Sequence, residues 1–206
     1  MDGTQLLRRL NYGWSDEAQL AGEAILKLFI ARLNATSGRT ALLVSRKTKR
    51  VSRVIQKHKQ YVADGCSEEE AIKKIRDLAG SRILVCCLRD VNYAHELFCK
   101  YIERRKRVCL VDGDCESHSR DTGYRALHQN TLVKLRNSNW FPFEVQFLTF
   151  VQHTWDQIQH PVFESPPLYS EELRSGLRAL SDEFHRLCQN GDSFVAKIES
   201  IPRRIV

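Results

Sequence analysis

Long hydrophobic runs and turn-forming residues are scarce in this sequence of 206 residues. The longest uninterrupted apolar stretch extends only from Ile83 to Leu88, whereas a membrane-spanning helix needs about 20 apolar residues. Arg8 and Arg9 near the N-terminus are not followed by the apolar segment of a secretory signal. We therefore expect a cytoplasmic protein without a membrane segment. Ten glycines and five prolines are too few for a disordered or fibrous chain.

Paired cysteines are also lacking, although the chain contains seven cysteines. Seven is an odd number, and no two of them form a C-x-x-C pair. Adjacent Cys86 and Cys87 lie in an apolar run, where we expect them to act as small buried hydrophobic residues. The sequence therefore favours neither a disulfide framework nor a zinc site.

Positive charge is abundant, because 32 lysines and arginines against 25 acidic residues give a formal net charge of +7. This balance favours polyanionic partners such as nucleotides or RNA, without choosing between them. Hydrophobic residues make up 42% of the chain and charged residues 28%, which indicates one folded domain, or one domain with helical appendages.

Helical and strand patterns alternate through the middle of the chain. Apolar residues recur at helical spacing after Ser15, and a capping box at Ser67–Glu70 begins another helix. We expect helices over 15–33, 45–59, 67–78, 90–102, 149–160 and 170–189, and strands over 40–44, 81–88, 107–111, 125–135 and 140–147. The segment 40–44 could instead begin the next helix. These elements predict an α/β (α+β) fold in which helices pack on a mixed β-sheet and flank it at both ends.

Three breaks in the pattern mark the predicted connections. Residues 112–122 are almost free of apolar side chains and should form a surface loop of a length that often carries function. Pro161 should end the helix over 149–160, and Asn190 with Gly191 should end the last helix.

A carboxylate and an aromatic–imidazole pair are the first candidate site residues. Asp77 is predicted at a helix end beside the mouth of a strand, where a cap or an ion-pair role would also fit. Strand alternation places Tyr124, Ala126 and His128 on one face and Arg125 on the other. Tyrosine beside imidazole suits a purine stacked on Tyr124 with phosphate or hydroxyl contacts to His128, although a half-buried strand explains the pattern equally well.

A second carboxylate occurs on the last predicted strand, where Glu144 and Gln146 share one face. Pairing with the preceding strand could bring Glu144 toward His128. Two carboxylates, Asp77 and Glu144, could hold Mg²⁺ together with substrate phosphates, whereas each alone could also be a solvated surface charge. The helix over 45–59 has a basic face composed of Arg46, Lys49, Arg50, Arg53 and Lys57.

Four sequence blocks, in this order, closely resemble the synthetase domain of the RelA/SpoT family. This family comprises alarmone synthetases, which move a pyrophosphate group from ATP to the 3′-hydroxyl of a guanine nucleotide. The resemblance covers about Arg39 to His160. The blocks are Asp77–Arg82 (the aspartate segment), Gly123–His128 (similar to G-Y-R-S-L-H), Glu144–Gln146 (similar to E-x-Q) and Trp155–His160 (similar to W-A-x-x-E-H). In the last block we expect Trp155 and Ile158 to lie in the core and His160 to cap the end of the helix.

The resemblance implies a nucleotidyltransferase-like fold with a synthetase core over 39–165 and helical segments over 1–38 and 166–206. It implies Mg²⁺ as the cofactor, held by Asp77 and Glu144, with Glu144 also acting as the base, Arg82 contacting ATP and Tyr124 stacking on the acceptor base. Phosphoryl-type transfer needs mainly positioning and neutralisation of developing charge, which these residue types supply. The substrate-binding residues implied are Arg46, Lys49, Lys57, Tyr124, Arg125, His128 and Gln146.

Three departures from the family pattern are visible, and one of them is that W-A-x-x-E-H has become Trp155-Asp156-Gln157-Ile158-Gln159-His160. The basic block S-R-x-K-x-x-x-S has Thr48 at its lysine position, with Lys47 and Lys49 beside it. The family's Q-I-R-T segment has Leu148 in place of its arginine, which predicts altered substrate geometry or reduced activity.

Three functions remain open on sequence alone. The first is a pyrophosphokinase acting on ATP and GDP or GTP. The second keeps this chemistry but uses the tRNA 3′ end as acceptor, as some toxic small members of the family do, and would call for an antitoxin partner. The third is a catalytically degenerate module that binds nucleotide or RNA. Adenine acceptors are a minor variant of the first two, and the oligomeric state is open in all three.

Overall fold

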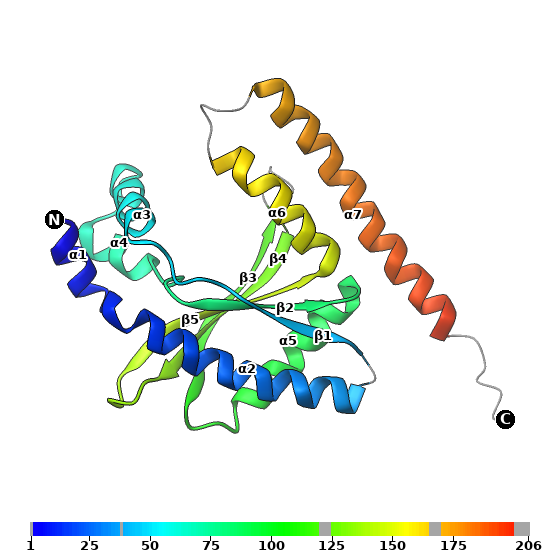
Figure 1. Ribbon diagram of the computed structural model, residues 1–206, viewed down its shortest axis with the longest axis horizontal. Helices are drawn as coiled ribbons and strands as arrows, with labels where there is room; N and C mark the ends of the chain where they lie inside the picture. The colour runs from blue at the N-terminus through cyan, green and yellow to red at the C-terminus, as the bar shows by residue number, and fades with distance from the viewer. Residues whose placement is uncertain (1, 38, 120–124, 165–169, 200–206) are drawn as a thin grey trace.

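A computed structural model describes residues 2–37, 39–119, 125–164 and 170–199. Helices alternate with strands along the chain (Figure 1). The elements are α1 (Gly3–Arg9), the 3-10 turn η1 (Tyr12–Trp14), α2 (Ser15–Ser37), β1 (Ala41–Ser45), α3 (Val51–Ala63), α4 (Glu68–Lys74), β2 (Gly80–Val85), α5 (Leu88–Ile102), β3 (Val108–Ser119), β4 (Arg125–Lys134), β5 (Trp140–Thr149), α6 (Phe150–Glu164) and α7 (Glu171–Glu199).

The five strands form one mixed sheet in the order β1-β2-β5-β4-β3, which confirms the predicted fold class. Among the strands of the described residues, only β2 and β5 run parallel, while the other neighbouring strands are antiparallel. The parallel pair sits at the centre of the sheet and sets Gly80 opposite Glu144 and Arg82 opposite Gln146. Two segments that are far apart in the sequence thus meet at the start of β2.

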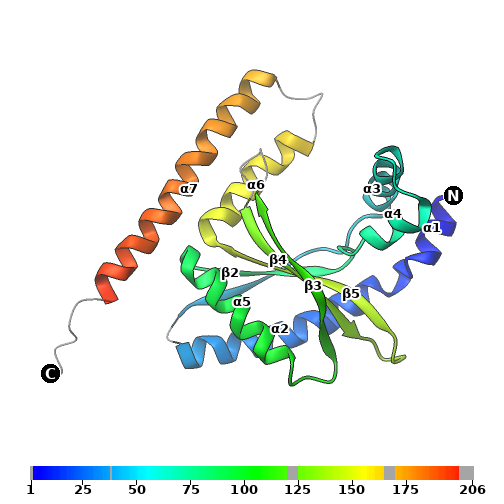
Figure 2. The same ribbon diagram turned by 180° about the vertical axis from the view of Figure 1, so that it is seen from behind.

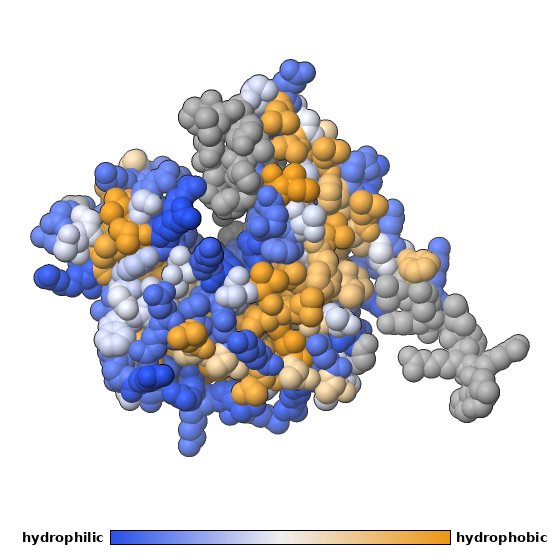
Figure 3. All heavy atoms as spheres, viewed as in Figure 1, coloured by the Kyte–Doolittle hydropathy of each residue, from blue (hydrophilic) through white to orange (hydrophobic). Residues whose placement is uncertain are grey.

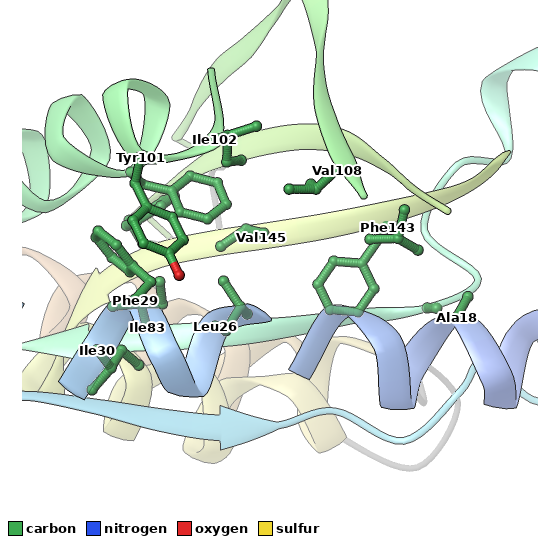
Figure 4. Close-up of a cluster of buried hydrophobic side chains, with 14 of the residues drawn as sticks. Ala18, Leu26, Phe29, Ile30, Ile83, Tyr101, Ile102, Val108, Phe143 and Val145 are labelled. Atoms are coloured by element: carbon green, nitrogen blue, oxygen red, sulfur yellow. The ribbon is translucent and has the colours of Figure 1, made fainter. Parts of the chain in front are cut away.

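Helices α2 and α5 cover one face of the sheet (Figures 1 and 2). Alternate β5 residues Phe143, Val145 and Phe147 point into this layer, as the two-residue period of a strand requires. Phe98 of α5 links the layers, with ring centroids 5.4 Å from Phe147 and 5.3 Å from Phe29 of α2. Figure 4 shows the packed side chains between α2, α5 and the sheet. The opposite face of the central strands carries Glu144 and Gln146 together with a small apolar cluster of Leu84, Ala126 and Leu148.

Helix α2 lies unusually close to the sheet because of a glycine. A Cβ atom on Gly22 would come within 2.3 to 2.5 Å of three ring atoms of Phe143, which is itself fully buried. Only glycine lets the helix backbone pack directly on this ring.

Two predicted boundaries around the candidate site residues are wrong. Helix α4 ends at Lys74 rather than near Leu78, because Ile75 leaves the helical conformation and the Leu78 carbonyl instead accepts a hydrogen bond from the Lys49 N–H at 3.0 Å. Asp77 therefore lies in the connection to β2, not at a helix end. The predicted loop over 112–122 is a strand as far as Ser119, since β3 pairs with β4 beyond an irregularity between Leu110 and Cys115.

Several helix positions also differ from the prediction. Helix α3 begins at Val51, and α5 begins at Leu88 with Cys87, not Asp90, as its N-cap. Helix α6 continues past Pro161 to Glu164, so Pro161 lies inside this helix and does not end it. Helix α7 continues through Gly191 to Glu199. Among the helices of the described residues, none is long and apolar enough to cross a membrane.

Candidate active site

Glu144 is brought beside the start of β2 by the close approach of two backbones. A Cβ on Gly80 would lie 2.5 Å from the Glu144 carbonyl oxygen, so this position requires glycine. The side chain of Gln19 in α2 holds the same glycine, accepting from its N–H and donating to its carbonyl oxygen, each at 2.9 Å. The Asp77–Gly80 segment is thereby fixed against β5.

Asp77 is neutralised by two lysines from the β1–α3 region. Lys49 forms an ion pair with Asp77 Oδ2, and Lys57 Nζ lies 3.0 Å from the same oxygen. Burial alone would raise the pKa of Asp77, but the charges of Lys57 and Lys49 outweigh burial and lower it, while the negative charge of nearby Glu144 acts in the opposite sense. Asp77 is therefore ionised at neutral pH.

The two lysines respond differently to the same carboxylate. Burial lowers the pKa of Lys49, and the charge of Asp77 only partly offsets it. Burial also acts to lower the pKa of Lys57, but Asp77 outweighs it and the pKa is raised. The backbone of Lys49 is held by Leu78 and by the Tyr12 hydroxyl, which donates to the Lys49 carbonyl oxygen.

Glu144 is buried, and its carboxylate contacts three polar side chains. His128 Nδ1 lies 3.1 Å from its Oε1, while Oε2 pairs with Arg46 and accepts from Gln146 Nε2 at 2.6 Å. Burial alone would raise the pKa of Glu144, but the hydrogen bond with His128 and the charge of Arg46 hold it well below its usual value. The second carboxylate is therefore ionised as well.

Arg82 is fixed by side chains from two elements. Its Nε donates to Gln146 Oε1 at 2.9 Å, one terminal nitrogen lies 3.0 Å from His153 Nδ1, and the other donates to Asp156 Oδ2 at 2.6 Å. The pKa of His153 is lowered by burial and by the Arg82 charge, so its ring is neutral and its Nδ1 accepts a hydrogen bond from the Arg82 guanidinium. Sequence reasoning missed His153 and Asp156, although an aspartate in place of the alanine of W-A-x-x-E-H was a visible signal.

Most of the predicted site residues are brought together on the open face of the sheet. Polar contacts run without interruption from Asp156 through Arg82, Gln146 and Glu144 to Arg46. The predicted residues in this cluster, here called the carboxylate cluster, are Arg46, Lys49, Lys57, Asp77, Arg82, His128, Glu144 and Gln146.

Two predicted residues are not part of the carboxylate cluster. Arg125 lies on the opposite face of β4 from His128, and its terminal nitrogen is 3.9 Å from Asp182 of α7. Tyr124 lies outside the described residues, so its proposed stacking role stays a prediction.

Two of the departures from the family pattern, at Thr48 and at Leu148, have simple structural counterparts. Thr48 donates to Asp16 of α2 at 2.9 Å, and it is the neighbouring Lys49 that reaches Asp77. Leu148 is fully buried with Leu84 and Ala126 in a small apolar cluster on the same face as Glu144. The predicted core position Ile158 is 45% exposed, whereas Trp155 is buried against Phe184 as expected.

The carboxylate cluster fits a magnesium ion. Asp77 Oδ1 is buried and accepts no hydrogen bond from the described residues, which is the arrangement expected of an oxygen that can take a metal. Within the described ranges no three His, Cys, Asp or Glu side chains form a metal-binding group. Two ionised carboxylates suit Mg²⁺ because this ion commonly uses one or two carboxylates and completes its shell with substrate phosphates and water.

The cations of the carboxylate cluster are also suited to a polyphosphate. Arg46, Lys49 and Lys57 approach from the β1–α3 region, and Arg82 approaches from β2. Figure 1 shows α3 and α4 at one end of the sheet and α6 at the other, all on the side away from α2. The site can thus hold a charged substrate between metal and basic side chains.

Solved structures share this fold. The small alarmone synthetase 1 from Bacillus subtilis bound to its product pppGpp superposes with a TM-score of 0.73 at 20% identity, covering 94% of this chain and 100% of that chain. The small alarmone synthetase 2 from the same organism superposes with a TM-score of 0.67 at 18% identity, covering 90% of this chain and 97% of that chain. A structure from Streptococcus mutans superposes with a TM-score of 0.68 at 21% identity, covering 90% of this chain and 95% of that chain. No curated protein matches the sequence significantly.

A family model supplies the assignment that these distant structures alone do not. The model described as the region found in RelA / SpoT proteins matches residues 46–163, which contain every residue of the carboxylate cluster. Because this match spans more than half of the chain and the fold is that of the small alarmone synthetases, the protein belongs to the RelA/SpoT synthetase family.

Proposed function

We propose that this protein is a Mg²⁺-dependent pyrophosphokinase that transfers the β,γ-pyrophosphoryl group of ATP to the 3′-hydroxyl of GDP or GTP. The observation that carries the proposal is the pairing of two ionised carboxylates, Asp77 and Glu144, within a ring of basic side chains. The small alarmone synthetase 1 from Bacillus subtilis has been crystallised with pppGpp and with AMPCPP, which supports a guanine product and an adenine donor here.

In the proposed reaction the acceptor 3′-oxygen bonds to the β-phosphorus of ATP. The bond between this phosphorus and the oxygen bridging to the α-phosphate breaks, and AMP leaves. Arg46, Lys49 and Lys57 bind the donor phosphates and stabilise the charge that spreads over them. Bound Mg²⁺, held by Asp77 and Glu144, would neutralise phosphate charge and acidify the attacking hydroxyl.

Glu144 is the residue proposed to take the hydroxyl proton. It is ionised but a weak base while Arg46 is paired with it. When Arg46 turns to a donor phosphate, Glu144 Oε2 is released from this ion pair and can contact the acceptor hydroxyl. His128 and Gln146 keep the carboxylate oriented.

The assay uses ATP labelled on the γ-phosphate, Mg²⁺, and GDP, GTP, ATP or deacylated tRNA offered separately. Label should move to GDP or GTP, and Glu144→Gln or Asp77→Asn should remove nearly all transfer. Glu103→Gln, an isosteric change at an exposed glutamate, is the matched control and should leave transfer unchanged. Activity that survives Glu144→Gln contradicts the assignment.

A second candidate keeps the chemistry and uses the tRNA 3′ end as acceptor. The observation favouring it is the basic run Arg104–Arg107, which is exposed and forms no ion pair with a carboxylate of the described residues. Lys134 lies close by, because its N–H donates to the Arg107 carbonyl, and its ammonium lies 5.9 Å from the exposed Trp140 ring. Cations beside an aromatic ring suit single-stranded nucleic acid.

The same assay separates the candidates. Label found only on tRNA, with transfer falling steeply as salt rises, selects the second candidate, whose toxicity would call for a neutralising partner. Transfer to no acceptor, with nucleotide binding retained, selects a degenerate binding module, for which the buried Leu148 would be the first position to examine.

A further inference from the structure

Two cysteines converge on one histidine outside the carboxylate cluster. His95 and Cys99 are one turn apart on α5, and the Cys99 sulfur lies 3.4 Å from His95 Nε2. Cys115 of β3 approaches the same nitrogen from the sheet, with its sulfur at 3.5 Å. We call Cys99 and Cys115 the thiol pair. Figure 2 shows α5 and β3 side by side at the front, on the side of the molecule that faces away from the viewer in Figures 1 and 3.

Strand pairing explains why Cys115 faces α5. Its partner on β4 is Gln129, and residues that lie directly opposite each other on neighbouring strands point to the same face of the sheet. Gln129 is buried, and its Oε1 lies 2.9 Å from His95 Nε2, so this face is the one beneath α5. The register of the sheet thus directs the Cys115 side chain toward Cys99.

The position of the His95 proton follows from Gln129. The Gln129 amide nitrogen donates to the Asn130 carbonyl oxygen at 2.9 Å, so its oxygen is the atom that faces His95 Nε2. An amide oxygen only accepts hydrogen bonds, which assigns the ring proton to Nε2. An N–H group beside a sulfur favours the thiolate, and the thiolate is the form that reacts with oxidants.

Exposure and charge give the two cysteines different roles. Cys115 is exposed, so a small oxidant in the solvent can reach it. Cys99 is half-buried, and burial together with the negative charge of Cys115 raises its pKa. Cys115 should therefore react first. Conversion of its thiolate to a neutral product would then remove one of the effects that keep Cys99 protonated.

We propose that the thiol pair is a peroxide-sensitive site that closes to a reversible disulfide between Cys99 and Cys115, linking α5 to β3. The Cys115 thiolate attacks one oxygen of hydrogen peroxide, the O–O bond breaks and hydroxide leaves, which yields a sulfenic acid. The Cys99 thiolate then attacks the Cys115 sulfur, the S–O bond breaks and a second hydroxide leaves. The two thiol protons convert both hydroxides to water. The sulfurs are oxidised, the peroxide is reduced, and a thiol reductant restores the pair.

The cross-link would form close to the carboxylate cluster. Gln129, opposite Cys115, directly follows His128, whose Nδ1 lies 3.1 Å from Glu144 on the other face of the sheet. The disulfide would therefore fix β3 against α5 one residue away from a side chain that orients Glu144. The chemistry of the thiol pair does not rest on the proposed transfer reaction, since the disulfide is detected directly.

Disulfide mapping of the full chain tests the proposal. The protein is treated with hydrogen peroxide, its remaining thiols are alkylated, and its peptides are analysed by mass spectrometry. Cleavage before aspartate separates Cys115 from Cys109, because Asp112 and Asp114 lie between them. The wild type should give a cross-linked peptide pair containing Cys99 and Cys115, which a thiol reductant should remove. The bond should form about tenfold faster, or more, in the folded chain than in urea, where the two cysteines are no longer held together.

Single variants separate the roles of the two cysteines. Cys99→Ser and Cys115→Ser should each abolish the cross-link. Dimedone, which labels sulfenic acids, should modify Cys115 in the Cys99→Ser variant, where no second thiol can displace the hydroxyl, and should leave Cys99 unmodified in the Cys115→Ser variant. Cys86→Ser is the matched control, because it removes another exposed cysteine and should leave the cross-link unchanged. Circular dichroism verifies that all variants are folded.

Three results would each overturn the proposal. The first is a peroxide-treated wild type without the bond between Cys99 and Cys115, or with Cys109 in place of either cysteine. The second is a bond that forms equally fast in urea. The third is dimedone labelling of Cys99 rather than Cys115 in the single variants.

Discussion

At the scale of single residues, Gly80 matters because it lets two chain segments approach that carry the two carboxylates. We expect Gly80→Ala to reduce pyrophosphate transfer at least tenfold, since the new Cβ would collide with the Glu144 backbone oxygen and displace Glu144 from Asp77. Steady-state rates with ATP and GDP measure the effect. Gly13→Ala is the control, because no atom lies within 4 Å of the Cβ it adds. Equal activity of both variants would show that the close approach is not needed.

His153 gives a titration that reports directly on the contacts of Arg82. Burial and the charge of Arg82 lower its pKa, while Asp156 acts to raise it. The pH midpoint at which the His153 imidazole proton resonances shift in NMR should therefore lie below 6.5. This midpoint should rise in the Arg82→Gln variant and fall further in the Asp156→Asn variant. His153→Gln, which retains an acceptor for Arg82, identifies the resonance by its loss.

The lowered pKa of His153 also fixes the direction in which pH changes the stability of the fold. A lowered histidine pKa stabilises the folded state above the unfolded value of about 6.5, and this contribution is lost as pH falls through the folded pKa. Urea unfolding should therefore show the free energy of unfolding of the wild type falling more than that of His153→Gln as the pH decreases below about 6.5. A wild-type midpoint at or above 6.5 would contradict the contact.

At the scale of elements, two glycine substitutions test how closely α2 packs on the sheet and how far α7 extends. Gly22→Ala should destabilise the fold by about 1 to 3 kcal/mol, because Phe143 has no room to move. Gly191→Ala should instead stabilise it by about 0.5 to 1 kcal/mol, because α7 continues through this position and no atom lies within 4 Å of the added Cβ.

Urea unfolding of both variants gives the two free energies. A Gly191→Ala variant that is less stable than the wild type would mean that the helix stops where the sequence pattern suggests. A neutral Gly22→Ala would mean that α2 does not lie as close to Phe143 as described.

Two errors in the predicted elements, those at β3 and at the end of α4, share one cause, which is tertiary contact overriding the local sequence pattern. The polar segment up to Ser119 forms a strand because β4 supplies its hydrogen-bond partners, not because its residues favour strands. The Ile75–Ala79 connection leaves the helix because Lys49 pairs with Leu78. The strands that carry Glu144, Gln146 and His128 were predictable, since strong alternation and a four-residue turn mark that hairpin.

At the scale of the whole molecule, strand register brings together residues that sequence order keeps apart. The motif blocks pointed to Asp77, Arg82 and Glu144, and the parallel pairing of β2 with β5 sets Gly80, three residues after Asp77, opposite Glu144 and sets Arg82 opposite Gln146. The contacts of Arg82 with His153 and Asp156 were not predictable, because they depend on how α6 folds back beside β2. Arg125 shows the converse, since a motif neighbour of His128 points to α7 instead.

The stoichiometry of the reaction tests the central claim most directly. Phosphorus NMR of a mixture of protein, Mg²⁺, ATP and GDP should show one AMP for each GDP consumed and a new pyrophosphoryl group on the acceptor. The Glu144→Gln variant should show neither. Formation of ADP and inorganic phosphate without a modified acceptor, or equal turnover by Glu144→Gln, would contradict the account that the Asp77 and Glu144 carboxylates direct pyrophosphate transfer.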